Sequence, residues 1–85
     1  MIFNDNEKIL TTKELEQSEF MKYSILFIRN VIRDDNNNLI KCSVIAMDDN
    51  PLSGFSNNLP EGTMEVFLTN KGAVEAFGFL GLGWH

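Results

Sequence analysis

Two apolar segments separated by a turn dominate this sequence. Residues 22–33 (KYSILFIRNVIR) and 39–47 (LIKCSVIAM) are rich in β-branched and aromatic residues, which favour strands. Between them, residues 34–38 (DDNNN) are all Asp or Asn, whose side chains bind their own backbone in turns. This arrangement predicts a long β-hairpin.

Two short helices are expected around the hairpin. Thr11 and Glu14 have the spacing of a capping box, in which each side chain binds a free backbone N–H group at the start of a helix. The first helix is therefore expected over residues 12–20. The second is expected to begin at Thr69 or Asn70 and to close at a left-handed glycine, Gly78.

Chain length limits how these elements combine. The chain has 85 residues, enough for one domain with one small core. Residues 63–69 (TMEVFLT) predict a third strand. The predicted fold is therefore α+β: a small antiparallel sheet of three or four strands with two short helices, in the order α-β-β-β-α, forming a single domain over residues 1–85.

Alternation along the predicted strands gives each later strand one apolar face and one mixed face. The apolar face of the second strand holds Ile40, Cys42, Val44 and Ala46. Ile45 and Met47 lie on its mixed face, and Phe67 lies on the mixed face of the third strand. Two explanations remain open for these residues. Either the second helix and the C-terminal tail cover them, or a second chain or a partner protein does.

Two further segments stand out by length and composition. Residues 48–62 form a predicted loop that is long for so small a domain, and such loops are often functional. Phe55, between a glycine and a serine, is the aromatic residue in this loop expected to be exposed. Residues 79–85 (FLGLGWH) form a glycine-rich apolar tail that contains Trp84. Both aromatic residues are candidate contacts for a partner.

The charge is negative and uneven. The chain carries a formal net charge of −5, all of it in residues 34–85. This balance argues against direct binding of nucleic acid, whose affinity comes largely from cationic side chains. One interpretation is ordinary solubility. The other is an acidic face that docks on a basic protein surface, and its candidate residues are Asp48, Asp49, Glu61 and Glu65.

No catalytic set is recognisable. The one histidine is His85, at the end of the given sequence, and the one cysteine, Cys42, lies in the middle of an apolar strand. A nucleophile needs a base held within hydrogen-bond reach, and neither residue is placed for this. The turn cluster at residues 34–38 departs from the calcium-loop pattern. We therefore expect a protein that is not an enzyme and that has no metal site and no cofactor.

Cellular location is also predicted. No apolar run approaches the roughly 20 residues that span a bilayer, and residues 1–10 lack the pattern of a signal peptide. A single cysteine cannot form an internal disulfide. These features predict a cytoplasmic protein without membrane contact.

The sequence leaves three hypotheses for function. The first is a non-enzymatic protein-binding module, such as a small acidic inhibitor or immunity-type protein, for example a mobile-element or phage inhibitor of a host defence protein. Such a module would occlude a surface of a larger protein. The second is a small-ligand-binding homo-oligomer, with a pocket between chains, and the third is a structural or assembly subunit.

Overall fold

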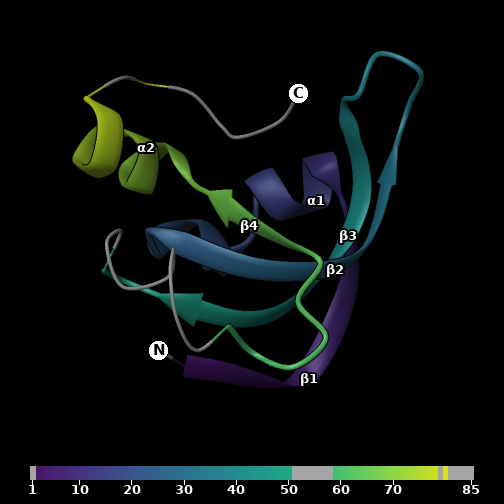
Figure 1. Cartoon of the computed structure of the whole chain (residues 1–85), viewed down its shortest axis with the longest axis horizontal. Coiled ribbons are helices and arrows are strands. Elements are labelled where there is room, and N and C mark those ends of the chain that lie inside the picture. Colours follow the sequence, from purple (N-terminus) through teal and green to yellow (C-terminus); the bar gives the residue numbers. More distant parts are fainter. Residues whose placement is uncertain (1, 51–58, 79, 81–85) are drawn as a thin grey trace.

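The computed structural model is a four-stranded antiparallel sheet with short helical segments (Figure 1). It describes residues 2–50, 59–78 and 80, with side chains from residue 7 onward. The predicted α+β fold and antiparallel sheet are confirmed. In chain order the elements are β1 (Ile2–Thr11), α1 (Thr12–Glu16), the 3₁₀ helix η1 (Glu19–Lys22), β2 (Ile25–Arg33), β3 (Leu39–Asp48), β4 (Glu65–Leu68) and α2 (Asn70–Phe77).

The N-terminal strand β1 was not predicted. Its sequence, IFNDNEKILT, has five consecutive polar residues and no clean alternation. β1 is a strand because it pairs with β3, through Ile9 opposite Ser43 and Leu10 opposite Cys42. The order of strands across the sheet is β1-β3-β2-β4, so the hairpin strands lie in the middle.

The helix boundaries follow the predicted caps. The Thr11 hydroxyl accepts a hydrogen bond from the Glu14 amide, and the Glu14 carboxylate accepts one from the Thr11 amide. The predicted first helix is interrupted after Glu16, however, and resumes as η1. α2 begins after Thr69, whose hydroxyl accepts a hydrogen bond from the Gly72 amide. α2 ends at Gly78, which has a left-handed φ of 75°.

Irregular pairing between β2 and β3 changes which residues share a face. The register shifts at three places: between Phe27 and Ile28, between Arg29 and Ile32, and between Ile32 and Arg33. Each shift places one extra residue in one strand, which is the geometry of a β-bulge. The strict alternation that the sequence suggested therefore fails along β3.

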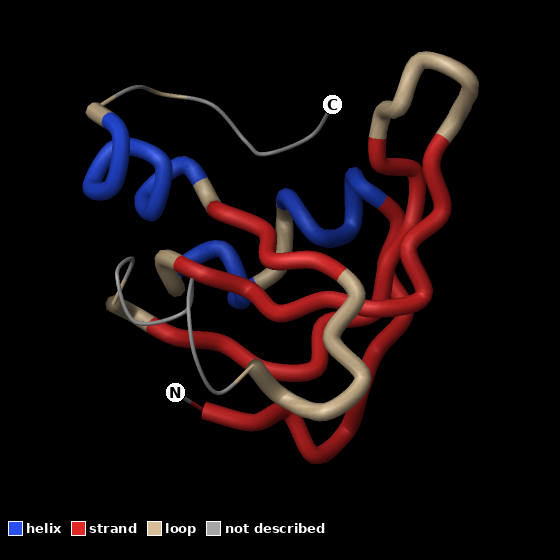
Figure 2. Tube along the Cα trace, in the orientation of Figure 1, coloured by secondary structure: helices blue, strands red, loops and turns tan. Residues whose placement is uncertain are grey.

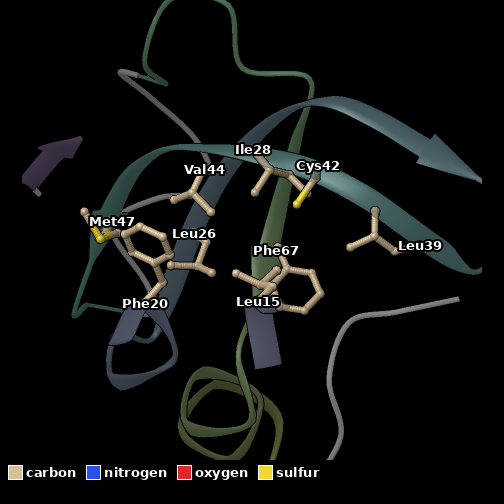
Figure 3. Packing of buried hydrophobic residues seen from close by; sticks show 9 residues of the cluster. All are labelled: Leu15, Phe20, Leu26, Ile28, Leu39, Cys42, Val44, Met47 and Phe67. Carbon is tan, nitrogen blue, oxygen red and sulfur yellow. The ribbon is translucent and has the colours of Figure 1, made fainter. Parts of the chain in front are cut away.

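The main core lies between the sheet and the segment formed by α1 and η1. Leu15 from α1 and Phe20 from η1 face the sheet (Figure 3). The strand residues that they cover are Leu26, Ile28, Leu39, Cys42, Val44, Met47 and Phe67, all buried. We call this side of the sheet the helix face.

A smaller cluster lies on the opposite side of the sheet, which we call the open face. It contains Ile25, Phe27, Ile45 and Ala46, with Val66 and Leu68 half-buried beside it. Residues 59–64, the described part of the connection between β3 and β4, cross this face (Figure 2). In the described part of that connection Pro60 is buried, and the Met64 amide donates to the Ile28 carbonyl, 2.9 Å away.

These clusters correct two predictions. Ile45 and Phe67 were expected on the mixed strand faces, as candidate partner contacts, but only 9% and 3% of their surface is accessible. Ile45 is the extra residue of a bulge and joins Ala46 in the smaller cluster. Phe67 faces the main core, while its neighbours on β4 lie on the open face. Of the two explanations left open for these two side chains, cover by a second chain is not needed, because both are buried within this chain.

Candidate partner-binding surface

Four large apolar side chains are exposed on the open face of the sheet. Ile9 of β1 is 56% accessible, Ile32 of β2 50%, Ile40 of β3 45% and Met64, just before β4, 62%. We call these four residues the open-face patch.

Strand alternation places all four on one side. Leu10, Val31 and Leu39 each pack against the main core, and each is the chain neighbour of one isoleucine of the patch. Successive side chains of a strand point to opposite faces, so the three isoleucines point to the open face. Met64 is the chain neighbour of Glu65, which is paired with Ile28 of the main core. By the same alternation, the Met64 side chain points to the open face.

The strand pairing gives the dimensions of the patch. Ile9 is opposite Ser43, and Ile32 is opposite Lys41, so the two residues differ by two positions along β3. Ile40 lies one position further, so with strands about 4.8 Å apart and a rise of about 3.3 Å per residue the four residues span roughly 14 Å across the strands and 10 Å along them.

A polar network fixes the middle of the open face. Glu7 of β1 and Arg29 of β2 form an ion pair across β3, in which the Arg29 Nε lies 2.9 Å from Glu7 Oε1. Asn30 donates to Glu7 Oε1, at 3.2 Å, and to the buried Ser43 hydroxyl, at 3.1 Å. The network therefore joins three neighbouring strands.

The charges in this network stabilise each other. Hydrogen bonds from Arg29 lower the pKa of the Glu7 carboxyl, and the same bonds raise the pKa of the Arg29 guanidinium. Both groups are therefore charged at neutral pH and neutralise one another. The centre of the surface is fixed and carries little net charge.

Asn30 has an unusual backbone conformation for a strand. Its φ is +54°, a left-handed value that asparagine tolerates better than most residues. It lies where β2 contains an extra residue opposite β3. The sequence carried a signal for this bulge, namely an asparagine inside the apolar run ILFIRNVIR. The patch could not be predicted without the bulges, because they turn Ile40 away from the core.

The connection between β3 and β4 borders the patch. Gly62 lies against the Arg29 side chain: a Cβ atom added to it would be 2.9 Å from Arg29 Nη1. Thr63 donates to the Pro60 carbonyl from its amide and from its hydroxyl, which closes a tight turn. Glu61, at the tip of this turn, is exposed.

The predicted acidic face is not assembled. Glu65 pairs with Arg33, at 2.6 Å. Asp49 lies 3.9 Å from Lys71 of α2, and Asp48 accepts a hydrogen bond from the Asn50 amide. Of the four predicted acids, Glu61 borders the open-face patch, whereas Asp48 and Asp49 lie at the end of β3 far from the hairpin turn. The predicted partner contacts Phe55 and Trp84 lie outside the described residues.

Three observations bear on chemistry. Burial raises the pKa of the Cys42 thiol to about 11, so it is protonated at neutral pH. Within residues 2–50, 59–78 and 80, no three His, Cys, Asp or Glu side chains are placed to share a metal ion, and no pocket is found. The prediction that the protein is not an enzyme remains a prediction.

None of the helices described is long and apolar enough to cross a membrane.

The chain was compared with protein-family models, with curated proteins and with solved structures, and it matches none of them.

Proposed function

We propose that this protein is a non-enzymatic protein-binding module, of the inhibitor or immunity type, that acts in the cytoplasm by occluding a surface of a larger protein. The observation that carries the proposal is the open-face patch, in which all four strand regions contribute an exposed apolar residue to one side of the sheet.

The energetic argument supports an interface. Full burial of one such side chain is worth about 1.5–3 kcal/mol, so leaving four of them half exposed forgoes about 4 kcal/mol. That is a large share of the roughly 5–15 kcal/mol by which a domain is stable. Four exposed apolar side chains on one side of the sheet support a surface that is covered when the protein acts.

Capture from lysate tests this proposal. The tagged chain, the variant Ile32→Ser/Ile40→Ser and a control variant Val74→Ser are each incubated with lysate of the cells that make the protein. Val74, on α2, is 43% accessible, close to the 45% of Ile40, so the control removes a similarly exposed side chain elsewhere. We expect one protein to be retained by the wild type and the control and lost with the double variant. Equal retention by all three chains would reject the open-face patch as the binding surface.

A further inference from the structure

The two edges of the sheet differ in regularity. β1 forms one edge, and its pairing with β3 is interrupted by a register shift between Phe3 and Lys8. β4 forms the other edge, and all four of its residues pair with β2 in one unbroken register. Bulges, prolines and lysines protect many edges against a further strand, and β4 (EVFL) contains none of these. β4 is therefore the edge that is suited to accept another strand.

The backbone groups of β4 alternate in direction. The Thr69 amide donates to the Ser24 carbonyl, 3.2 Å away, and this pair continues the register in which Leu68 lies opposite Ile25. In an antiparallel ladder, residues that bond to the neighbouring strand alternate with residues whose N–H and C=O groups point the other way. Because Thr69 bonds towards β2, Leu68 and Val66 point their N–H and C=O groups away from β2.

These outward groups are free of cover in the described part of the chain. There, β2 is the only strand paired with β4, and no further hydrogen bond involves Val66 or Leu68. α2 lies beyond the end of β4 (Figure 1) and packs towards β2, where Gly72 lies against the Ser24 carbonyl. The edge therefore offers two donors and two acceptors, on residues about 7 Å apart.

The side chains at this edge favour an apolar strand. Val66 and Leu68 are half-buried and pack against the smaller cluster on the open face. In an added strand, the residue opposite each of them has its side chain on the same face. Apolar residues at these two positions would extend the smaller cluster. The geometry therefore favours a segment with apolar residues at alternate positions.

A second copy of this chain is a poorer occupant. It could form the same ladder, with its own Leu68 opposite Val66. Each copy carries −5, however, so two copies repel each other. β4 supplies four residues, whereas a stable interface between two proteins takes roughly 20–30 residues from each. The edge is better matched to a single extended peptide segment.

We propose that the β4 edge is a second binding site, which takes an extended segment of another protein as an added antiparallel strand with apolar residues at alternate positions. Main-chain hydrogen bonds to Val66 and Leu68 provide the affinity, and the apolar residues of the segment provide the selectivity. This site goes beyond the function proposed for the open-face patch, and each surface binds without the other.

The probe is a capped heptapeptide of the sequence Lys-Thr-Val-Thr-Val-Thr-Lys, whose valines have the required spacing. In the proposed pairing the valine amides point towards β4 and the threonine amides point away. Two modified peptides therefore give a matched comparison: one is N-methylated on both valines, and the other on the threonines that precede them. Binding to the full ¹⁵N-labelled chain is followed by NMR amide shifts and hydrogen exchange.

We expect the unmodified peptide to shift the Val66 and Leu68 amides and to slow their hydrogen exchange. The Thr69 amide, which is bonded to Ser24, should exchange slowly with or without the peptide. Valine methylation removes two hydrogen bonds, each worth a few-fold in affinity, so binding should weaken by about tenfold or more. The threonine-methylated peptide should bind within about threefold of the unmodified one.

Two variants of the chain test the same edge. Val66→Pro removes an outward donor, and proline is tolerated where the N–H group of an edge strand faces away from the sheet. It should weaken binding of the unmodified peptide by about fivefold or more. Val66→Thr keeps the amide and serves as the control, within about threefold of wild type. Ile32→Ser/Ile40→Ser should bind the peptide as wild type does, because its substitutions lie on the open-face patch.

Several outcomes would overturn the inference. These are equal binding of the three peptides, shifts confined to β1, or no binding at millimolar peptide. Slow exchange of the Val66 and Leu68 amides in the chain alone would show that the edge is already paired. Sedimentation of a dimer that Val66→Pro abolishes and Val66→Thr keeps would assign the edge to a second copy. If Val66→Pro fails to fold, the three peptides on the wild-type chain still decide. Failure of the lysate capture would reject the role of the open-face patch alone.

Discussion

Gly72 is a residue at which α2 closely approaches the backbone just before β2. A Cβ atom added there would lie 2.0 Å from the Ser24 carbonyl oxygen and 2.8 Å from its carbonyl carbon. The contact is with backbone, so no side chain can move aside. Next to it, the Thr69 hydroxyl donates to the Tyr23 carbonyl, at 2.7 Å, so α2 is held by hydrogen bonds as well.

Gly72→Ala is expected to lower the free energy of unfolding by about 3 kcal/mol, because α2 must move off the Ser24 backbone. Gly78→Ala is the control. Its φ is positive but a Cβ atom there would meet nothing within 4 Å, so the cost should be about 1 kcal/mol. Urea denaturation of both variants measures the difference, and equal losses would contradict the close contact.

Cys42 illustrates how burial controls reactivity. Its side chain is fully buried, and its pKa is raised to about 11, chiefly by desolvation and next by the charge of Glu65. At about pH 8 the thiolate fraction is therefore about 100-fold smaller than for an ordinary thiol. We expect a disulfide reagent to modify Cys42 only in unfolded chains, at a rate that rises with urea. Fast modification of the folded protein would show that the thiol is accessible.

At the scale of elements, the Glu7–Arg29 pair links β1 to β2 across β3. The pKa of the Glu7 carboxyl is lowered in the folded protein, mainly by hydrogen bonds from Arg29. Its contribution to stability is therefore fully present above the pKa of the unfolded chain and is lost as the pH falls through the folded pKa. Glu14 and Asp34, whose pKa values are lowered by backbone hydrogen bonds, act in the same direction.

Glu7→Gln is expected to remove part of this acid sensitivity. The free energy of unfolding, measured in urea at about pH 7 and about pH 3, should fall less between the two conditions than it does in the wild type. Glu16→Gln changes the same charge at an exposed position of α1 and serves as the control. An identical pH dependence for wild type and Glu7→Gln would mean that the pair does not contribute to folding.

β4 is a short edge strand whose third residue, Phe67, is in the main core. Phe67→Glu would place a carboxylate among apolar side chains, and we expect a loss of more than about 3 kcal/mol of stability. Met64 lies just before the same strand at an exposed position, so Met64→Glu serves as the control. It should change the free energy of unfolding by no more than about 0.5 kcal/mol. Thermal denaturation followed by circular dichroism compares the two, and a folded Phe67→Glu chain would contradict the position of this side chain.

At the scale of the whole molecule, the two faces of the sheet have different covers. Helical segments cover one face, whereas residues 59–64 cross the other and leave the residues of the open-face patch exposed. The net charge of −5 adds a long-range attraction to any basic partner. Charge and apolar contact should therefore affect different steps of binding.

For the protein captured from lysate, rising salt should slow association, because screening weakens electrostatic steering. Ile32→Ser/Ile40→Ser should instead accelerate dissociation, by about tenfold or more. Asp48→Asn/Asp49→Asn should slow association only as much as Glu16→Gln/Glu19→Gln, since both change the net charge equally. Stopped-flow kinetics separate these rates, and a selective effect of Asp48 and Asp49 would place the contact at the far end of β3.

The sequence alone determined those features that depend on neighbouring residues. Each of these features is encoded within a few positions, and the structure contains all of them: the hairpin strands, the turn at residues 34–38, the capping box at Thr11 and the left-handed C-cap at Gly78. The α+β class follows from these elements. β1 was missed because its own residues do not favour a strand, and only pairing with β3 makes it one.

Tertiary structure decided which side chains are buried. The faces of β2 and β3 depend on register, and a single extra residue reverses every side chain beyond it. The bulges at Asn30, Ile40 and Ile45 therefore placed Ile45 inside and Ile40 outside, against the alternation in the sequence. The candidate surface could not be predicted for the same reason: its residues are apolar like those of the core, and only strand pairing shows which of them remain in contact with water.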